Sequence, residues 1–191
     1  MNNRSDKLRN ILEKLYAKYS RKEFIKSDPL WFVYRYSTPA DMEIAGLLAA
    51  VLAYGRVQQI KKSLISLLGC MGNSPLEFVG SFNGHNRKKL KDFRHRFTTG
   101  ENIADLLELL KIVYKRHGSL ENYFLTGYSP DNRNTLGGLA NFCNGFLRLY
   151  VETHNNQPAR GLKYLLAGPD GKSACKRMNL FLRWMIRDKD V

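Results

Sequence analysis

The sequence lacks the cysteine content and the long apolar runs that define several classes of protein. Its three cysteines, Cys70, Cys143 and Cys175, are spaced like neither a zinc site nor a disulfide framework. Its longest apolar run, residues 44–53, is too short to span a bilayer, and its first residues form no apolar signal region. We therefore expect a cytoplasmic protein with reduced thiols, no bound metal or other cofactor, and no membrane partner.

Acidic residues are also scarce, because 17 Asp and Glu stand against 31 Lys and Arg. The resulting formal charge of +14 at pH 7 favours polyanionic partners. Nucleic acid, and duplex DNA in particular, is the partner that we expect. Residues 85–96 alone hold six basic residues against one acid, and the candidate contacts among them are Arg87, Lys88 and Lys89. A solvated charged face is the alternative interpretation of this segment.

The sequence contains no internal repeat, and no segment in which apolar and polar residues alternate over the length of a β-strand. Apolar residues recur at helical spacing instead. Residues 44–53 are apolar on nearly every side and include small residues that let another helix approach closely, so we predict a central buried helix over residues 41–53. Proline follows Asp28, Thr38 and Ser74, a pattern typical of a helix N-terminus.

These patterns predict an all-α fold, a compact multi-helical domain over residues 1–191 with two lobes around a cleft. The turn-rich segment 128–134 is the predicted boundary between the lobes. Residues 103–117 predict a further amphipathic helix with an inward apolar face, and Gly118 is its predicted end.

The C-terminal residues 165–187 combine a tight turn with an amphipathic helix. Gly168 and Pro169 end one helix, and Ser173 is the predicted N-cap of the next. A turn with free amide groups, followed by a basic stripe, is well suited to bind phosphate, although a solvated charged face has the same pattern. The candidate nucleic-acid contacts in this helix-hairpin-helix-like element are Gly168, Gly171, Lys172, Ser173, Arg177, Arg183 and Arg187.

Two stretches, residues 43–60 and 168–185, resemble a known pattern. They are similar to an uncharacterised bacterial family of unknown function, which is itself distantly similar to the helix-hairpin-helix DNA glycosylases of the endonuclease III type. The first stretch resembles a buried glycosylase helix that ends in a polar, DNA-facing turn. This resemblance implies that residues 54–59 form that turn, with Tyr54 and Arg56 as nucleic-acid contacts.

The second stretch resembles the glycosylase helix whose early lysine is the Schiff-base nucleophile. The order of Lys176, Asn179 and the apolar run after it matches that helix, so the resemblance implies a catalytic Lys176. Its amine must be neutral to attack the sugar, whereas a free lysine has a pKa of about 10.4. Neighbouring cations such as Lys172, Arg177 and Arg183 lower the pKa of a lysine.

The sequence departs from the glycosylase pattern in three respects. The Gly-x-Gly of the hairpin is replaced by Gly168 and Gly171 with two residues between them, and the four cysteines of an iron–sulfur cluster are missing. The sequence also ends at Val191, before the position of the catalytic aspartate. We therefore expect a C-terminally truncated chain that binds DNA without turnover.

Three functions are compatible with these features. The leading one is a DNA-binding protein with base-excision glycosylase or lyase chemistry in its full-length form. The second is a non-enzymatic helical module that binds nucleic acid. The third is a protein-interaction domain in which the positive charge serves solubility, and whether the protein is an enzyme stays open.

Overall fold

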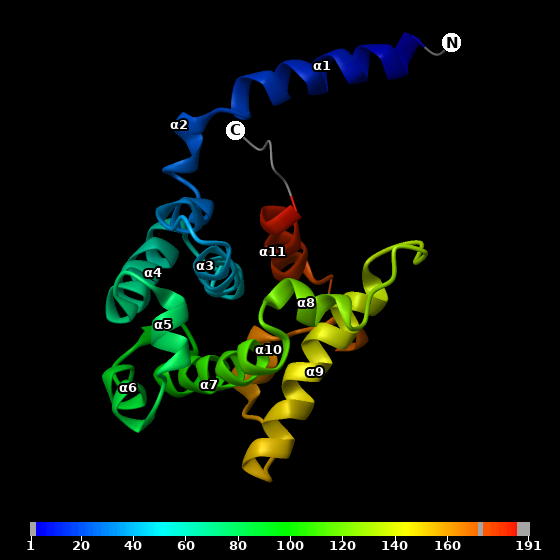
Figure 1. The fold of residues 1–191 in the computed structure, drawn as a ribbon. Helices are drawn as coiled ribbons and strands as arrows, with labels where there is room; N and C mark the ends of the chain where they lie inside the picture. The colour runs from blue at the N-terminus through cyan, green and yellow to red at the C-terminus, as the bar shows by residue number, and fades with distance from the viewer. Residues whose placement is uncertain (1–2, 172–173, 187–191) are drawn as a thin grey trace.

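The computed structural model describes residues 3–171 and 174–186, and it confirms the predicted all-α fold (Figure 1). Among these residues the only sheet is a hairpin of two very short strands, although the sequence predicted no strand. The same residues contain no helix that is long and apolar enough to cross a membrane.

The elements follow one another in this order: α1 Asn3–Tyr19, α2 Lys22–Ile25, the 3-10 helix η1 Pro29–Arg35, α3 Pro39–Val51, α4 Val57–Met71, α5 Pro75–Gly80, α6 Gly84–Lys89, β1 Arg94–His95, β2 Thr98–Thr99, α7 Gly100–His117, α8 Leu120–Leu125, α9 Leu136–His154, α10 Arg160–Leu165, the 3-10 helix η2 Pro169–Gly171 and α11 Lys176–Ile186. The predicted helix starts are confirmed, because the side chains of Asp28, Thr38 and Ser74 each accept a backbone N–H of the following turn. The predicted helix 103–117 corresponds to α7, and Gly118 ends it with φ of +79°.

The central buried helix predicted over residues 41–53 is α3. From Ile44 to Val51 every residue of α3 is buried, and η1, α4, α5 and α11 pack around it. Gly46 lets α11 approach, since a Cβ atom at this position would lie 2.8 Å from the Cε atom of Met185. The apolar composition of α3 therefore places it at the centre of the core.

Two carboxylates of α3 fix the starts of other helices. The Asp41 carboxylate accepts hydrogen bonds from the Ser74 hydroxyl at 3.0 Å and the Leu76 N–H at 2.8 Å, at the start of α5. The Glu43 carboxylate accepts the Leu120 N–H at 2.8 Å at the start of α8, together with the Tyr114 hydroxyl of α7 at 2.7 Å. Negative charge at a helix N-terminus is stabilising, so α3 orients both helices.

We call the helices that pack around α3 the body of the protein, and two segments extend from it (Figure 1). The first is α1, which is amphipathic but exposes its apolar side chains, among them Leu8, Leu12 and Leu15. The second is the loop between α8 and α9, which contains the predicted lobe boundary 128–134. A division into two lobes at this loop stays a prediction.

We expect Leu48→Ala to lower the free energy of unfolding by about 2–5 kcal/mol, because it leaves a cavity beside a helix that is enclosed on all sides. Urea denaturation followed by circular dichroism measures this change. Ile65→Ala is the matched control, because Ile65 lies on α4 with 53% of its surface exposed, and it should change stability by less than about 0.5 kcal/mol. Equal effects of the two substitutions would contradict the central position of α3.

Candidate nucleic-acid interface

The turn between α3 and α4 brings Tyr54, Gly55 and Arg56 to the surface. Gly55 has φ of +96°, a left-handed conformation that side chains disfavour. A Cβ atom at Gly55 would also lie 3.1 Å from the Cδ and Nη1 atoms of Arg96. Glycine therefore allows this turn to pack directly against the β1–β2 hairpin.

Three aromatic rings meet beside this turn, one from each of three elements. Phe97, at the tip of the hairpin, stacks on Tyr54 with the ring centres 5.2 Å apart. Tyr164 of α10 packs edge-on against both, at 4.5 Å from Phe97 and 5.3 Å from Tyr54. Phe97 nevertheless exposes 53% of its surface. We call Tyr54, Phe97 and Tyr164 the aromatic cluster, and its outer side is open to a flat apolar ligand.

Exposed arginines stand close in sequence to two residues of the aromatic cluster. Arg56 follows Tyr54 in the turn, and Arg94 and Arg96 precede Phe97 in the hairpin. In the part of the chain that the structure describes, these three arginines form no ion pair with a carboxylate. Their guanidinium groups are therefore available to an external anion, and guanidinium is well matched to phosphate.

Arg177, in the first turn of α11, binds the protein itself. Its guanidinium donates to the backbone oxygen of Val51 at 2.7 Å and to that of Tyr164, and it lies over the Tyr164 ring at 4.2 Å. Burial lowers the pKa of Arg177. The contact between Arg177 and nucleic acid stays a prediction. Two hydrogen bonds donated by its guanidinium already join α11 to α3 and α10.

The predicted phosphate-binding turn lies between α10 and α11. Gly168 packs against Cys143, and Gly171 is exposed at the end of η2. The predicted contacts Lys172, Ser173 and Arg187 lie outside the described residues. α11 begins at Lys176 rather than directly after Ser173, and Cys175 before it has φ of +49°. The side chains of Lys176 and Arg183 are exposed on α11.

The basic segment 85–96 divides into α6, a turn and the hairpin. Lys88 and Lys89 are exposed at the end of α6, and the contacts with nucleic acid that the sequence predicted for them stay predictions. Arg87 is engaged differently, because its guanidinium binds Glu101 at 2.6 Å, Asp105 at 2.9 Å and Glu108 at 2.8 Å. Its charge is neutralised within the protein, so we leave Arg87 out of the candidate interface.

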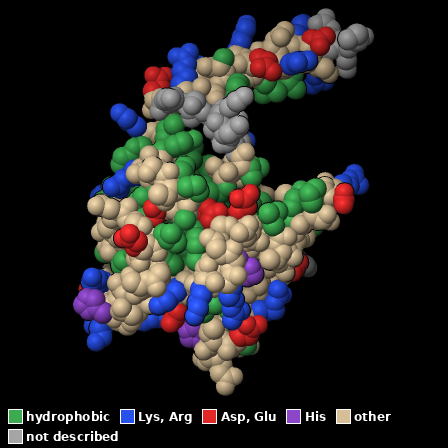
Figure 2. Space-filling model, in the orientation of Figure 1, with side chains coloured by type: hydrophobic (Ala, Val, Ile, Leu, Met, Phe, Trp, Pro, Cys, Tyr) green, Lys and Arg blue, Asp and Glu red, His purple; other side chains and the backbone are tan. Residues whose placement is uncertain are grey.

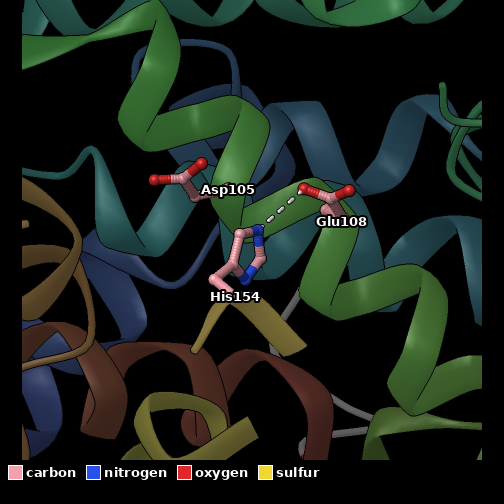
Figure 3. Close-up of side chains that lie close together, drawn as sticks. All are labelled: Asp105, Glu108 and His154. Atoms are coloured by element: carbon pink, nitrogen blue, oxygen red, sulfur yellow. Dashed lines mark hydrogen bonds and ion pairs between the residues drawn. The ribbon is translucent and has the colours of Figure 1, made fainter. Parts of the chain in front are cut away.

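Two of these carboxylates, those of Asp105 and Glu108, belong to a group that has the composition of a metal site. Asp105 and Glu108 of α7 and His154 of α9 place possible ligand atoms within 4.8 Å of one another, and His154 Nε2 lies 3.4 Å from a Glu108 oxygen (Figure 3). The Arg87 guanidinium already supplies the positive charge there. A metal ion would have to displace it, so this group is adequately explained as an ion-pair network.

The sequence predicted Tyr54 and Arg56 as contacts, but it did not predict that Phe97 and Tyr164 would lie beside them. One signal could have indicated Phe97, which stands between Arg96 and two threonines of high β-propensity, the pattern of a short basic hairpin. Tyr164 gave no comparable signal, because an aromatic residue in a helix is ordinarily buried.

A family model described as "Protein of unknown function (DUF2400)" matches residues 28–191. The chain belongs to this family. The resemblance to an unknown-function family is thereby confirmed, and α1 and α2 precede the matched residues. No curated protein and no solved structure matches the chain.

We expect Arg177→Met to lower the free energy of unfolding by about 2–3 kcal/mol, because it leaves the Val51 and Tyr164 carbonyl groups without their charged donor. Urea denaturation measures the loss. Lys176→Met is the matched control at the adjacent exposed position, and it should change stability by less than about 0.5 kcal/mol. A similar stability for both variants would show that Arg177 does not hold α11 to the body.

Proposed function

We propose that this protein binds nucleic acid, duplex DNA in particular, through the aromatic cluster and the arginines close to it in sequence. The observation that carries the proposal is the exposed ring of Phe97, which stacks on Tyr54 and follows Arg94 and Arg96 in the hairpin. Within the described residues these two arginines form no ion pair with a carboxylate. An aromatic side chain stacks on bases or wedges between them, and arginines fix the phosphate backbone.

The arrangement of the cluster favours binding for a further reason. Phe97 is exposed, yet its position is fixed by Tyr54 and Tyr164, and the Arg177 guanidinium lies over Tyr164. A side chain that is already ordered loses little conformational freedom when a ligand stacks on it. The net charge of +14 adds a long-range attraction toward the phosphates.

Base-excision lyase chemistry by Lys176 is the more specific form of this proposal. The distant similarity to helix-hairpin-helix glycosylases suggests it, and one structural observation favours it. Lys176 is exposed and directly precedes Arg177, which lies over the rings of Tyr54 and Tyr164. A nucleotide that contacts the aromatic cluster would therefore lie near the start of α11.

A protein-interaction role is the second candidate. The apolar side chains of α1 favour it, and Figure 2 shows such side chains along the side of α1 that faces the body. An apolar groove of about 790 Å³ between α3, α8 and α11 points the same way, since exposed apolar surfaces of this kind are typical of protein contacts.

We expect the protein to bind a short DNA duplex with an affinity that falls steeply as salt rises. Contacts with about five phosphates give a slope of roughly −4 to −5 in a plot of log affinity against log salt concentration. Fluorescence anisotropy titrations at salt concentrations between about 50 and 300 mM measure this slope. Absent binding at low salt would favour the protein-interaction role.

Two substitutions separate the contribution of aromatic stacking from that of phosphate contacts, in the same anisotropy titration. Phe97→Ala should weaken binding by about 1–3 kcal/mol at an unchanged slope, because it removes stacking and no charge. Arg96→Gln should reduce the steepness of the slope by about 1. Tyr34→Ala is the control, since Tyr34 is also an exposed aromatic residue but lies in η1.

The lyase form is tested on DNA with an abasic site. The neutral Lys176 amine adds to the aldehyde carbon of the opened sugar, water leaves, and borohydride reduces the imine to a stable amine that links protein and DNA. We expect Lys176→Gln to abolish this cross-link while DNA affinity stays within about threefold of the wild type. Lys115→Gln, at an exposed position of α7, should cross-link normally. Cross-linking by Lys176→Gln at the wild-type level would exclude Lys176 as the nucleophile.

A further inference from the structure

The hairpin that carries Phe97 is too small to hold its own shape. Each strand has two residues, and the pairs are Arg94 with Thr99 and His95 with Thr98. Arg96 at the tip has φ of +54°, a left-handed conformation that is unfavourable for arginine. Isolated two-stranded hairpins are marginally stable in water, so contacts with the rest of the fold must fix this one.

His95 provides these contacts from the inner side of the hairpin. Its side chain is fully buried, at 0% exposure. Nδ1 lies 2.9 Å from the Ser63 hydroxyl of α4, and Nε2 lies 3.1 Å from the backbone oxygen of Tyr54. The imidazole therefore bridges the hairpin to α4 and to the turn after α3.

Tyr54 returns two hydrogen bonds to the hairpin. Its hydroxyl donates to the backbone oxygen of His95 at 3.0 Å, and the Thr98 hydroxyl then donates to the Tyr54 oxygen at 2.7 Å. Burial raises the pKa of Tyr54, which keeps this donor protonated. His95 and Tyr54 thus bind each other reciprocally, and the Tyr54 ring that Phe97 stacks on is part of the same network.

The partners of His95 are all satisfied by its neutral form. A backbone oxygen can only accept, so Nε2 carries the hydrogen and Nδ1 accepts from the Ser63 hydroxyl. Burial lowers the pKa of His95 below its ordinary value of 6.5, and the charge of Arg96 lowers it further. Among the described residues, Tyr54 is a titratable side chain packed against the His95 ring, with the ring centres 4.6 Å apart. A charged imidazole would be buried beside Arg96.

We propose that His95 is the positioning residue of the nucleic-acid interface: in its neutral form it holds the hairpin against the Tyr54 turn, so that Phe97 and Arg96 face the ligand. This inference rests on the proposed function. It assigns to His95 no contact with nucleic acid, and it predicts that acidification releases the hairpin.

The positioning role of His95 predicts a pH dependence of DNA binding that is opposite in sign to the usual one. Acidification normally strengthens DNA binding, because exposed histidines gain positive charge. The stabilising contribution of the neutral His95 imidazole is present above its ordinary pKa of 6.5, and it is lost as the pH falls through the lowered pKa of the folded protein. We therefore expect the affinity of the wild type for DNA to decrease as the pH is lowered from 6.5.

Three variants test the inference by anisotropy with the DNA duplex. His95→Phe keeps a ring but removes both hydrogen bonds, and it should weaken binding about tenfold at pH 7.5. His95→Gln keeps a donor for the Tyr54 oxygen, so it should bind within about threefold of the wild type and lose the decrease at acid pH. His85→Gln, the control, should retain that decrease. Thermal unfolding verifies that each variant is folded at the temperature of the titration.

The possible outcomes separate this inference from the proposed function. Wild-type affinity in His95→Phe, or a wild-type affinity that rises steadily on acidification, would overturn the positioning role while DNA binding stands. If the wild type binds no DNA, the proposed function fails, and NMR then decides the positioning role alone. In that case the Phe97 ring signals should shift together with the titration of the His95 imidazole, and signals that stay unchanged would overturn it.

Discussion

The enclosure of α3 is the constraint on which the rest of the fold depends. The residues from Ile44 to Val51 are buried on every side of the helix, so no face of it can remain without a packing partner. Neighbours that approach this closely need the small side chains that α3 provides, such as Gly46 opposite Met185. Tyr54 follows the end of α3 at Val51, so the candidate interface continues directly from this buried helix.

Buried and half-buried polar groups then fix the ends of the other elements to α3. Asp41 and Glu43 receive the N–H groups at the starts of α5 and α8, and Arg177 donates to the Val51 oxygen at its C-terminal end. Burying such groups is costly unless every hydrogen bond is satisfied. In the described part of the chain no buried side-chain nitrogen or oxygen lacks a partner. Because hydrogen bonds are directional, they set the orientation of these elements where apolar packing alone would leave it loose.

The sequence predicted those features that depend on neighbours along the chain. The apolar run of α3, the Thr38 N-cap and the end of α7 at Gly118 are local, and the structure confirms them. The aromatic cluster could not be predicted in this way, because Tyr54, Phe97 and Tyr164 are brought together by tertiary packing. The contacts of Arg177 with Val51 and Tyr164 are likewise invisible in a helical pattern, which shows spacing but not what lies opposite. The family match shows to which family the chain belongs, and it says nothing of the function.

Two arginines of the same basic segment show why net charge alone does not locate an interface. Arg87 and Arg96 contribute equally to the charge of +14, and both stand in the run that first suggested a polyanionic partner. Yet Arg87 is bound by three carboxylates of α7, whereas Arg96 is exposed at a hairpin tip beside an aromatic ring. The attraction that a distant phosphate feels is common to both, but only a cation without an internal partner can form a new ion pair without breaking an old one. The coincidence of such cations with an ordered, exposed ring is therefore a sharper indicator of nucleic-acid binding than the charge of the whole chain.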